Sequence, residues 1–274
     1  MKRYNIIFVK NYILEKFRQN NIDDYESNYL LAEVLNCNIN DLILVKDVSS
    51  KDFCKIKHIV KVRIKGKPLT KIFKKAYFYG LEFFINNNVL SCRQETELII
   101  DAVINNTNSK DLKILDLCCG SGCIGITLKS IGFKDVTCAD ISKQALRVTK
   151  KNAKLLNQEV KIVKSDLFEN INEKYDIIVS NPPYIRSEDV QNLDIEVKKY
   201  DPIISLDGGV SGLDFYNNII KNLGDYLNNN GFAIFEIGYD QANDVKELLN
   251  KFNFNSEIIK DYSNNDRIII ATRR

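Results

Sequence analysis

Apolar positions in the first 79 residues recur with the spacing of an α-helix. Phe17 lies four residues after Ile13 and three after Leu14, so all three fall on one helix face. The segment SNYLLAEVL repeats this spacing, and Ser27 at its start is expected to be the helix N-cap. The segment GKPL at residues 66–69 interrupts the pattern. We therefore expect a small helical N-terminal domain over residues 1–79.

The next segment changes to strand-like alternation. FYGLEFFINNNVL, residues 78–90, predicts a short β-hairpin that turns on its three consecutive asparagines. We expect this hairpin to be a connector over residues 80–92, because RQETELIIDAVI at residues 93–104 returns to helical spacing.

From Asp111 onward, short apolar runs alternate with amphipathic segments. The runs KILDL, DVTCAD, VKIVKSD, YDIIVS and GFAIFEIG predict strands, and the segments between most of them predict helices. The last 21 residues predict a terminal pair of strands. Strands separated by helices need right-handed crossovers and form a mostly parallel sheet covered on both faces. The sequence thus predicts an α/β, Rossmann-like domain over residues 93–274.

A glycine loop follows the first strand of this domain. In LDLCCGSGCIG, residues 115–125, Gly120 and Gly122 allow the backbone to approach a ligand closely, and a helix begins directly afterwards. Asp140 ends the second strand, where a carboxylate can accept two hydrogen bonds from a ribose diol. The first glycine position of a dinucleotide loop is Cys118 here, and the segment Asp116–Gly122 resembles the D-x-G-x-G-x-G loop of S-adenosylmethionine-dependent methyltransferases.

A rigid acceptor loop follows the fourth strand. YDIIVSNPPYI, residues 175–185, ends on Asn181, two prolines and Tyr184. The side-chain oxygen of Asn181 and the carbonyl of Pro182 can each accept one N–H from a planar NH₂ group. Pro182 and Pro183 fix the backbone and add no competing donor, while Tyr184 offers an aromatic face. The loop therefore favours methyl transfer to an amide or amine nitrogen held by geometry.

Composition and charge narrow the alternatives. Seven cysteines, an odd number without framework spacing, favour a reducing cytoplasm, and a single histidine argues against a metal site. No segment is apolar enough to span a membrane, and no signal peptide is expected. The net charge is +3, but residues 1–90 carry 16 basic against 9 acidic residues. The basic stretch Lys51–Lys75 is either a solvated face or a surface for an acidic partner or RNA.

Taken together, these motifs carry a family resemblance over nearly the whole chain. GKPLTKI, ILDLCCGSGCIGITL, ADIS, NAKLL, SDLFE, IIVSNPPYI, YDPIISLDGGVSGLDFY and FEIG resemble the PrmC/HemK-type peptide chain release factor glutamine methyltransferases. The resemblance implies a Rossmann-like class I methyltransferase domain behind a helical substrate-recognition domain. It also implies methylation by S-adenosylmethionine of the amide nitrogen (N5) of the glutamine in the Gly-Gly-Gln motif of bacterial release factors.

The resemblance further implies roles for particular residues. Asp116 and the loop Cys118, Cys119, Gly120, Ser121 and Gly122 would bind the cofactor, Asp140 the ribose and Phe168 the adenine. Asn181, Pro182, Pro183 and Tyr184 would bind the glutamine, with Asn181 also next to the cofactor. We expect a monomer with release factors as protein partners and no nucleic-acid substrate.

Two departures and three alternatives accompany this interpretation. Cys118 and Cys119 replace the usual glycine and threonine, so a side chain could crowd the methionine end of the cofactor. The segment Leu90–Glu97 lacks two prolines usual in the family and should be less rigid. The alternatives are a ribosomal-protein glutamine methyltransferase, an adenine-N6 DNA methyltransferase, which would flip its target base, and a non-enzymatic binding protein of the same fold.

Overall fold

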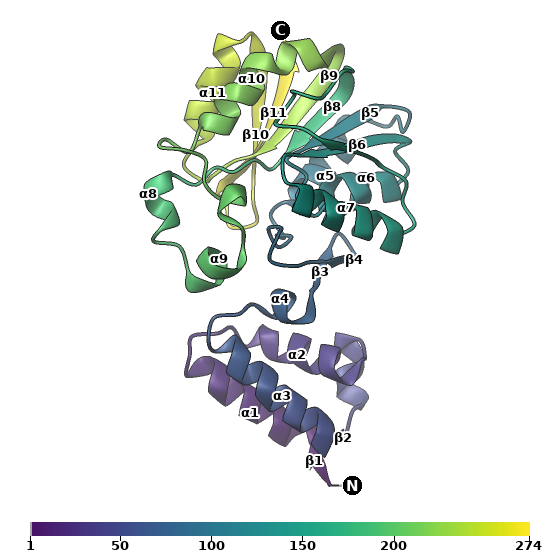
Figure 1. Ribbon diagram of the computed structural model, residues 1–274, viewed down its shortest axis with the longest axis vertical. Helices are drawn as coiled ribbons and strands as arrows, with labels where there is room; N and C mark the ends of the chain where they lie inside the picture. Colours follow the sequence, from purple (N-terminus) through teal and green to yellow (C-terminus); the bar gives the residue numbers. More distant parts are fainter. Residues whose placement is uncertain (1) are drawn as a thin grey trace. The chain divides into compact units, whose positions relative to one another are not determined.

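The computed structural model describes residues 2–274 (Figure 1). The chain forms two compact units, one up to Lys75 and one from Ala76 onward. Among the described residues, no helix combines the length and apolarity that a bilayer crossing requires.

The first unit is mainly helical, as the spacing of apolar residues predicts. Its elements are β1 (Arg3–Asn5), α1 (Ile6–Arg18), α2 (Tyr25–Leu35), the 3₁₀ helix η1 (Ile39–Leu44), β2 (Asp47–Ser49), α3 (Ser50–Arg63) and α4 (Leu69–Phe73). Ile13, Phe17 and Leu30 are fully buried in its core. Arg63 forms an ion pair with Glu26 at 2.6 Å between Nε and Oε2, which compensates the burial of the guanidinium group.

The expected N-cap at Ser27 is wrong. Helix α2 begins two residues earlier, and Ser27 lies buried in its first turn. There its hydroxyl donates to the carbonyl of Asp24 at 2.7 Å, and its backbone N–H also binds that carbonyl. A serine hydroxyl that bonds back to the preceding turn cannot cap the backbone N–H groups ahead of it.

A hairpin, β3 (Lys75–Phe78) and β4 (Leu81–Phe84), precedes the α/β part. Its turn is at Tyr79 and Gly80, not at Asn86–Asn88, so the expected position of the turn is wrong. Both turn residues have positive φ (49° and 76°), which a glycine adopts without steric cost. The backbone N–H of Tyr79 donates to Glu97 at 2.7 Å, which fixes the turn against the next helix.

The second unit confirms the predicted α/β fold. After the hairpin its elements are α5 (Glu97–Asn106), β5 (Lys113–Leu117), α6 (Cys123–Ser130), β6 (Asp135–Asp140), α7 (Lys143–Leu155), β7 (Lys161–Lys164), β8 (Tyr175–Ser180), α8 (Ser187–Val190), α9 (Ile195–Tyr200), η2 (Ile203–Ser205), α10 (Asp214–Tyr226), β9 (Leu227–Glu236), α11 (Ala242–Lys251), β10 (Phe254–Lys260) and β11 (Asp266–Arg273). Seven strands form one sheet in the order β10-β11-β9-β8-β5-β6-β7.

The sheet is parallel from β7 to β9, and the terminal pair β10 and β11 is antiparallel. Alternate residues of its central strands pack into two cores. Ile114 and Ile177 pack in the core with α5, α6 and α7, whereas Leu115 and Ile178 pack in the core with α10 and α11. Strand β5 has β6 on one side and β8 on the other, so the chain reverses direction across the sheet at β5. Ligands of open α/β sheets bind at such a switch point, beyond the carboxyl ends of the strands.

Candidate active site

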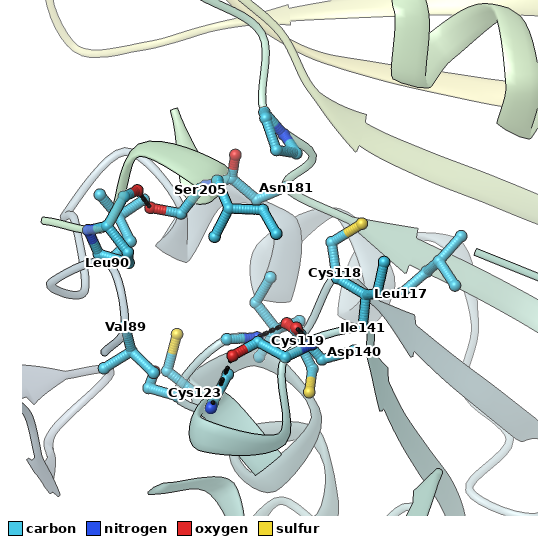
Figure 2. A pocket seen from close by; sticks show the side chains of 18 of the residues that line it. Val89, Leu90, Leu117, Cys118, Cys119, Cys123, Asp140, Ile141, Asn181 and Ser205 are labelled. Carbon is cyan, nitrogen blue, oxygen red and sulfur yellow. Dashed lines mark hydrogen bonds between the residues drawn. The ribbon is translucent and has the colours of Figure 1, made fainter. Parts of the chain in front are cut away.

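A cavity of about 260 Å³ opens at this switch point. Figure 2 shows Cys119, Asp140 and Cys123 on one side of it and Asn181 and Ser205 on the opposite side. Leu117 and Cys118 close a third side, and Val89 and Leu90 lie across from them. The cavity therefore lies between the glycine loop after β5, the end of β6, the loop after β8 and the segment before α5.

The glycine loop, which the sequence predicts to bind the cofactor, forms one wall of the cavity. Cys118, Cys119, Gly120 and Ser121 all line it. A Cβ at Gly120 would meet no atom within 4 Å, so the backbone lies open to a ligand at this point. Gly122 is not part of the lining, because it packs against α7, where a Cβ would lie 2.6 Å from Thr149 Cγ2.

Two side chains of α7 hold this loop in place. Thr149 donates from its hydroxyl to the Gly120 carbonyl at 2.9 Å. The Asn152 amide donates to the Ser121 carbonyl at 2.9 Å and also pairs with the backbone of Phe84 in β4. The loop conformation is therefore fixed by protein contacts before any ligand binds, which lowers the entropy cost of binding.

Asp140 lies at the end of β6, at the cavity wall. Its Oδ2 accepts the backbone N–H of Gly120 and its Oδ1 that of Ser142, each at 2.8 Å. Burial raises the pKa of the Asp140 carboxyl, and these two hydrogen bonds oppose the rise. Each oxygen keeps acceptor capacity for a further donor such as a ribose hydroxyl.

Besides Gly122, two more residues expected at the cofactor, Asp116 and Phe168, do not line the cavity. Asp116 is fully buried beneath the loop, where its Oδ2 accepts the Gly125 N–H at 2.8 Å and burial raises the pKa of its carboxyl to about 7. Phe168 is packed in the core with α10 and α11, where it stacks on Tyr226 with ring centroids 4.3 Å apart. Direct contact of either with the cofactor is thus not supported, and Leu167 lines the cavity instead.

The acceptor loop contributes Asn181 and Pro183 to the lining, whereas Pro182 and Tyr184 lie outside it. Asn181 Nδ2 donates to Thr96 Oγ1 at 3.2 Å. Within residues 2–274, no donor bonds to Asn181 Oδ1 or to the carbonyl of Pro182. Both proposed acceptors are therefore without a protein donor among these residues, but only Asn181 belongs to the cavity lining.

Neighbouring segments brace this loop. Gln241 donates from Nε2 to the Tyr184 carbonyl at 2.9 Å and to that of Gly212 at 3.2 Å. Gly208 approaches so closely that a Cβ there would lie 2.8 Å from the Pro183 carbonyl oxygen. The segment after the loop thus packs directly against its backbone, which limits its motion.

Several residues near the site were not predicted from the sequence. Asp166 follows β7 and lines the cavity, and Glu236 ends β9 and accepts hydrogen bonds from Thr96 and Tyr184. Both are polar residues at the carboxyl ends of parallel strands, so the rule that identified Asp140 could have identified them. Thr96, just before α5, carries no comparable signal.

The segment before α5, expected to be less rigid, is tied to a distant loop. Asp201 accepts the Ser91 N–H at 3.3 Å and pairs with Arg93 at 3.2 Å between Oδ2 and Nη2. Asp201 is buried, so its carboxylate is poorly solvated without these partners.

The acceptor groups and the walls of the cavity fit S-adenosylmethionine. Asp140 suits a ribose diol, the open backbone at Gly120 allows close approach, and Leu117, Ile141 and Leu167 provide apolar surface for an adenine ring. A seven-stranded sheet with this loop, this carboxylate and an N-P-P-Y acceptor loop defines an S-adenosylmethionine-dependent class I methyltransferase.

Comparison with known proteins identifies the family within this class. The family described as "Methyltransferase small domain" matches residues 90–198. The chain is 41% identical over 222 residues to a release factor glutamine methyltransferase of Clostridium acetobutylicum, covering 78% of each chain. It is 38% identical to that of Clostridium botulinum, covering 90% of this chain and 91% of the relative. The chain belongs to the release factor glutamine methyltransferase family.

Solved structures show the same fold at lower identity. A methyltransferase from Pyrococcus furiosus superimposes with a TM-score of 0.55 at 15% identity, covering 78% of this chain and 98% of that one. The ribosomal protein L11 methylase of Lactobacillus delbrueckii subsp. bulgaricus gives 0.51 at 21% identity, covering 66% and 80%. These similarities support the fold.

The two cysteines of the loop differ in backbone conformation, which gives a testable contrast. Cys118 has φ 61°, a left-handed conformation that costs a non-glycine residue roughly 1–2 kcal/mol, whereas Cys119 is not in that region. We expect Cys118→Gly to retain or raise the free energy of unfolding. Cys119→Gly should lower it by about 1 kcal/mol or more, because a buried side chain is lost and the chain gains freedom when unfolded.

Urea unfolding of both variants measures this contrast. An equal loss of stability in the two would contradict the strain assigned to Cys118. Calorimetric titration with S-adenosylmethionine would show in addition whether the Cys118 side chain crowds the cofactor, since Cys118→Gly would then bind more tightly.

Proposed function

We propose that this protein transfers a methyl group from S-adenosylmethionine to the side-chain amide nitrogen (N5) of the glutamine in the Gly-Gly-Gln motif of bacterial release factors. The observation that carries the proposal is the position of Asn181 at the wall of the cavity, where its side-chain oxygen accepts from no donor among residues 2–274. Membership of the release factor glutamine methyltransferase family supports the choice of substrate.

The chemistry of an amide explains why the loop is built of acceptors. The lone pair of an amide nitrogen is delocalised, so the nitrogen is a weak nucleophile and gains little from a general base. Bound S-adenosylmethionine supplies an electrophilic methyl group on a sulfonium centre. Asn181 Oδ1 and the Pro182 carbonyl would accept the two N–H groups, aim the nitrogen and stabilise the positive charge that develops on it. Correct positioning can lower such a barrier by about 7–11 kcal/mol.

The proton balance is simple. The nitrogen forms one bond to carbon, the methyl–sulfur bond breaks, and one N–H proton leaves to solvent with the product. No side chain has to act as a strong base, which agrees with an acceptor loop that carries no ionisable group except the Tyr184 phenol. Burial and the nearby Glu236 carboxylate raise the pKa of that phenol, so it stays neutral.

The same kind of loop could hold two other methyl acceptors, namely a glutamine of a ribosomal protein and the exocyclic amine of adenine in DNA. Incubation of the protein with methyl-labelled S-adenosylmethionine and, in turn, a purified release factor, ribosomal proteins or DNA distinguishes them. We expect label on the release factor, lost when its Gly-Gly-Gln glutamine is changed to alanine. Label on DNA alone would overturn the proposal.

We also propose that the first unit docks the release factor through α3. Five exposed lysines lie on α3 or directly after it, and none of them forms an ion pair within residues 2–274. They are Lys51, Lys55, Lys57, Lys61 and Lys65. Like charges four residues apart destabilise a helix slightly, so an acidic partner would relieve a repulsion already present.

Charge reversal tests this docking surface. We expect Lys55→Glu together with Lys61→Glu to raise KM for the release factor roughly tenfold at low salt, with kcat and cofactor affinity unchanged. The matched control reverses Lys221 and Lys246, two exposed lysines of α10 and α11. If both pairs of substitutions changed KM equally, the α3 lysines would form a solvated helix face with no role in docking. The monomeric state and the cytoplasmic location remain predictions from the sequence.

A further inference from the structure

A chain of hydrogen bonds runs from Asn181 away from the cavity to a buried carboxylate. Asn181 Nδ2 donates to Thr96 Oγ1 at 3.2 Å, and the Thr96 hydroxyl donates to Glu236 Oε2 at 2.6 Å. Thr96 and Glu236 are each only 3% exposed, so bulk water does not compete for these bonds. Three separate elements, namely the start of α5, the end of β8 and the end of β9, thus meet behind the acceptor loop.

The same carboxylate also binds the other end of the loop. Tyr184 donates from its hydroxyl to Glu236 Oε1 at 3.3 Å. The backbone carbonyl of Glu236 accepts the Tyr216 hydroxyl at 2.7 Å, which fixes the position of the strand end. Burial raises the pKa of the Glu236 carboxyl, while Thr96 and then the nearby Arg267 oppose that rise.

The direction of this chain has a chemical consequence. Glu236 accepts a hydrogen bond at each of its two oxygens, from Thr96 and from Tyr184, as an ionised carboxylate does, and a threonine hydroxyl has a single proton to donate. Because Thr96 gives that proton to Glu236, it can only accept from Asn181. The asparagine must therefore present its NH₂ group to Thr96 and its oxygen to the cavity. Without this constraint, the amide could rotate by 180° at little steric cost, since its two ends are nearly the same size.

We propose that Glu236 is a positioning residue that, through Thr96, sets which end of the Asn181 amide faces the substrate, while its second oxygen holds Tyr184. The inference rests on the proposed function, because an outward oxygen matters only if the acceptor presents N–H donors. It adds a role for a residue that touches neither substrate nor cofactor. One buried carboxylate then orients both ends of the acceptor loop.

Glu236→Gln tests the direction of the chain with almost no change of shape. A glutamine can donate from its amide to Thr96 Oγ1, which frees the threonine proton to point at Asn181. The asparagine oxygen would then turn inward and its NH₂ group outward, where it faces the N–H donors of the substrate. We expect kcat to fall at least about 100-fold, as when a preorganised transition-state partner is lost, while Kd for S-adenosylmethionine stays unchanged.

Substitutions at Thr96 provide the matched pair. Thr96→Ser keeps the hydroxyl and should retain most of kcat. Thr96→Val keeps the shape, removes the relay, and should lower kcat as Glu236→Gln does. Unchanged kcat in Glu236→Gln, or equal activity of the serine and valine variants, would overturn the inference. A fall in cofactor affinity and in thermal stability parallel to the fall in kcat would assign Glu236 a merely structural role and overturn it too.

A second readout is independent of the substrate. The side-chain ¹⁵N and proton resonances of Asn181 distinguish an amide that donates to a buried hydroxyl from one exposed to the cavity. We expect this signal to shift in Glu236→Gln and Thr96→Val but not in Thr96→Ser. If the wild-type protein did not methylate release factors, the proposed function would fail. The resonances of Asn181 would still show which end of its amide faces the cavity. An identical Asn181 signal in all variants would refute the relay alone.

Discussion

Replacing Asn181 by alanine is expected to lower kcat for glutamine methylation by roughly 10²–10³-fold, with Kd for S-adenosylmethionine nearly unchanged. The substitution removes the oxygen that would accept one N–H of the substrate amide. It leaves the glycine loop and Asp140 intact, since neither is hydrogen-bonded to Asn181. Single-turnover transfer to a release factor measures the rate, and calorimetry measures the affinity.

The matched control is Asn229→Ala, an exposed asparagine near the amino end of β9, away from the carboxyl end of the strand. It should leave both quantities at the wild-type level. If Asn181→Ala lost cofactor affinity in step with kcat, then Asn181 would hold the cavity together and would not position the acceptor nitrogen.

Replacing Asp140 by alanine should weaken S-adenosylmethionine binding by at least roughly 100-fold, because hydrogen bonds to a charged group contribute about 1.5–3 kcal/mol each. The substitution removes two acceptors for the ribose and also the partner of the Gly120 and Ser142 backbone N–H groups. We therefore expect lost affinity together with a less ordered loop, both measurable by calorimetry and by hydrogen exchange.

Asp135→Ala is the control for this substitution, because Asp135 lies at the other end of β6 and pairs with Lys161 at the surface. It should bind the cofactor normally. If Asp140→Ala bound S-adenosylmethionine with wild-type affinity, this carboxylate would not bind the ribose and would only stabilise the glycine loop.

Much of the fold follows from the sequence because buried parallel strands are short, continuous apolar runs. KILDL and YDIIVS are examples, and each ends on the loop expected to carry chemistry. Position at a strand end pointed to Asp140 and Asn181, and both residues line the cavity. It could not show on which side of the sheet Asp116 projects, since both faces of β5 are buried and polarity does not distinguish them.

The sequence alone also did not predict the hydrogen bonds between residues that are far apart in the chain. Thr96 and Glu236 are separated by 140 positions, and Thr96 and Asn181 by 85. Phe168 illustrates a different limit, because an aromatic residue beside a strand end can pack inward as readily as toward a ligand. Here stacking on Tyr226 places it in the core, and the adjacent Leu167, at φ 45°, is the residue that lines the cavity.

The bonds behind the acceptor loop bear on how this sequence can diverge over generations. Each hydrogen bond between Asn181, Thr96 and Glu236 needs one donor and one acceptor. A neutral amide at position 236 is therefore tolerated only if its neighbours change as well. Such mutual dependence makes substitutions at the three sites epistatic. Lineages that share this arrangement should therefore change the pattern of donors and acceptors at the three positions together, while a substitution that keeps the pattern, such as serine for Thr96, can occur alone.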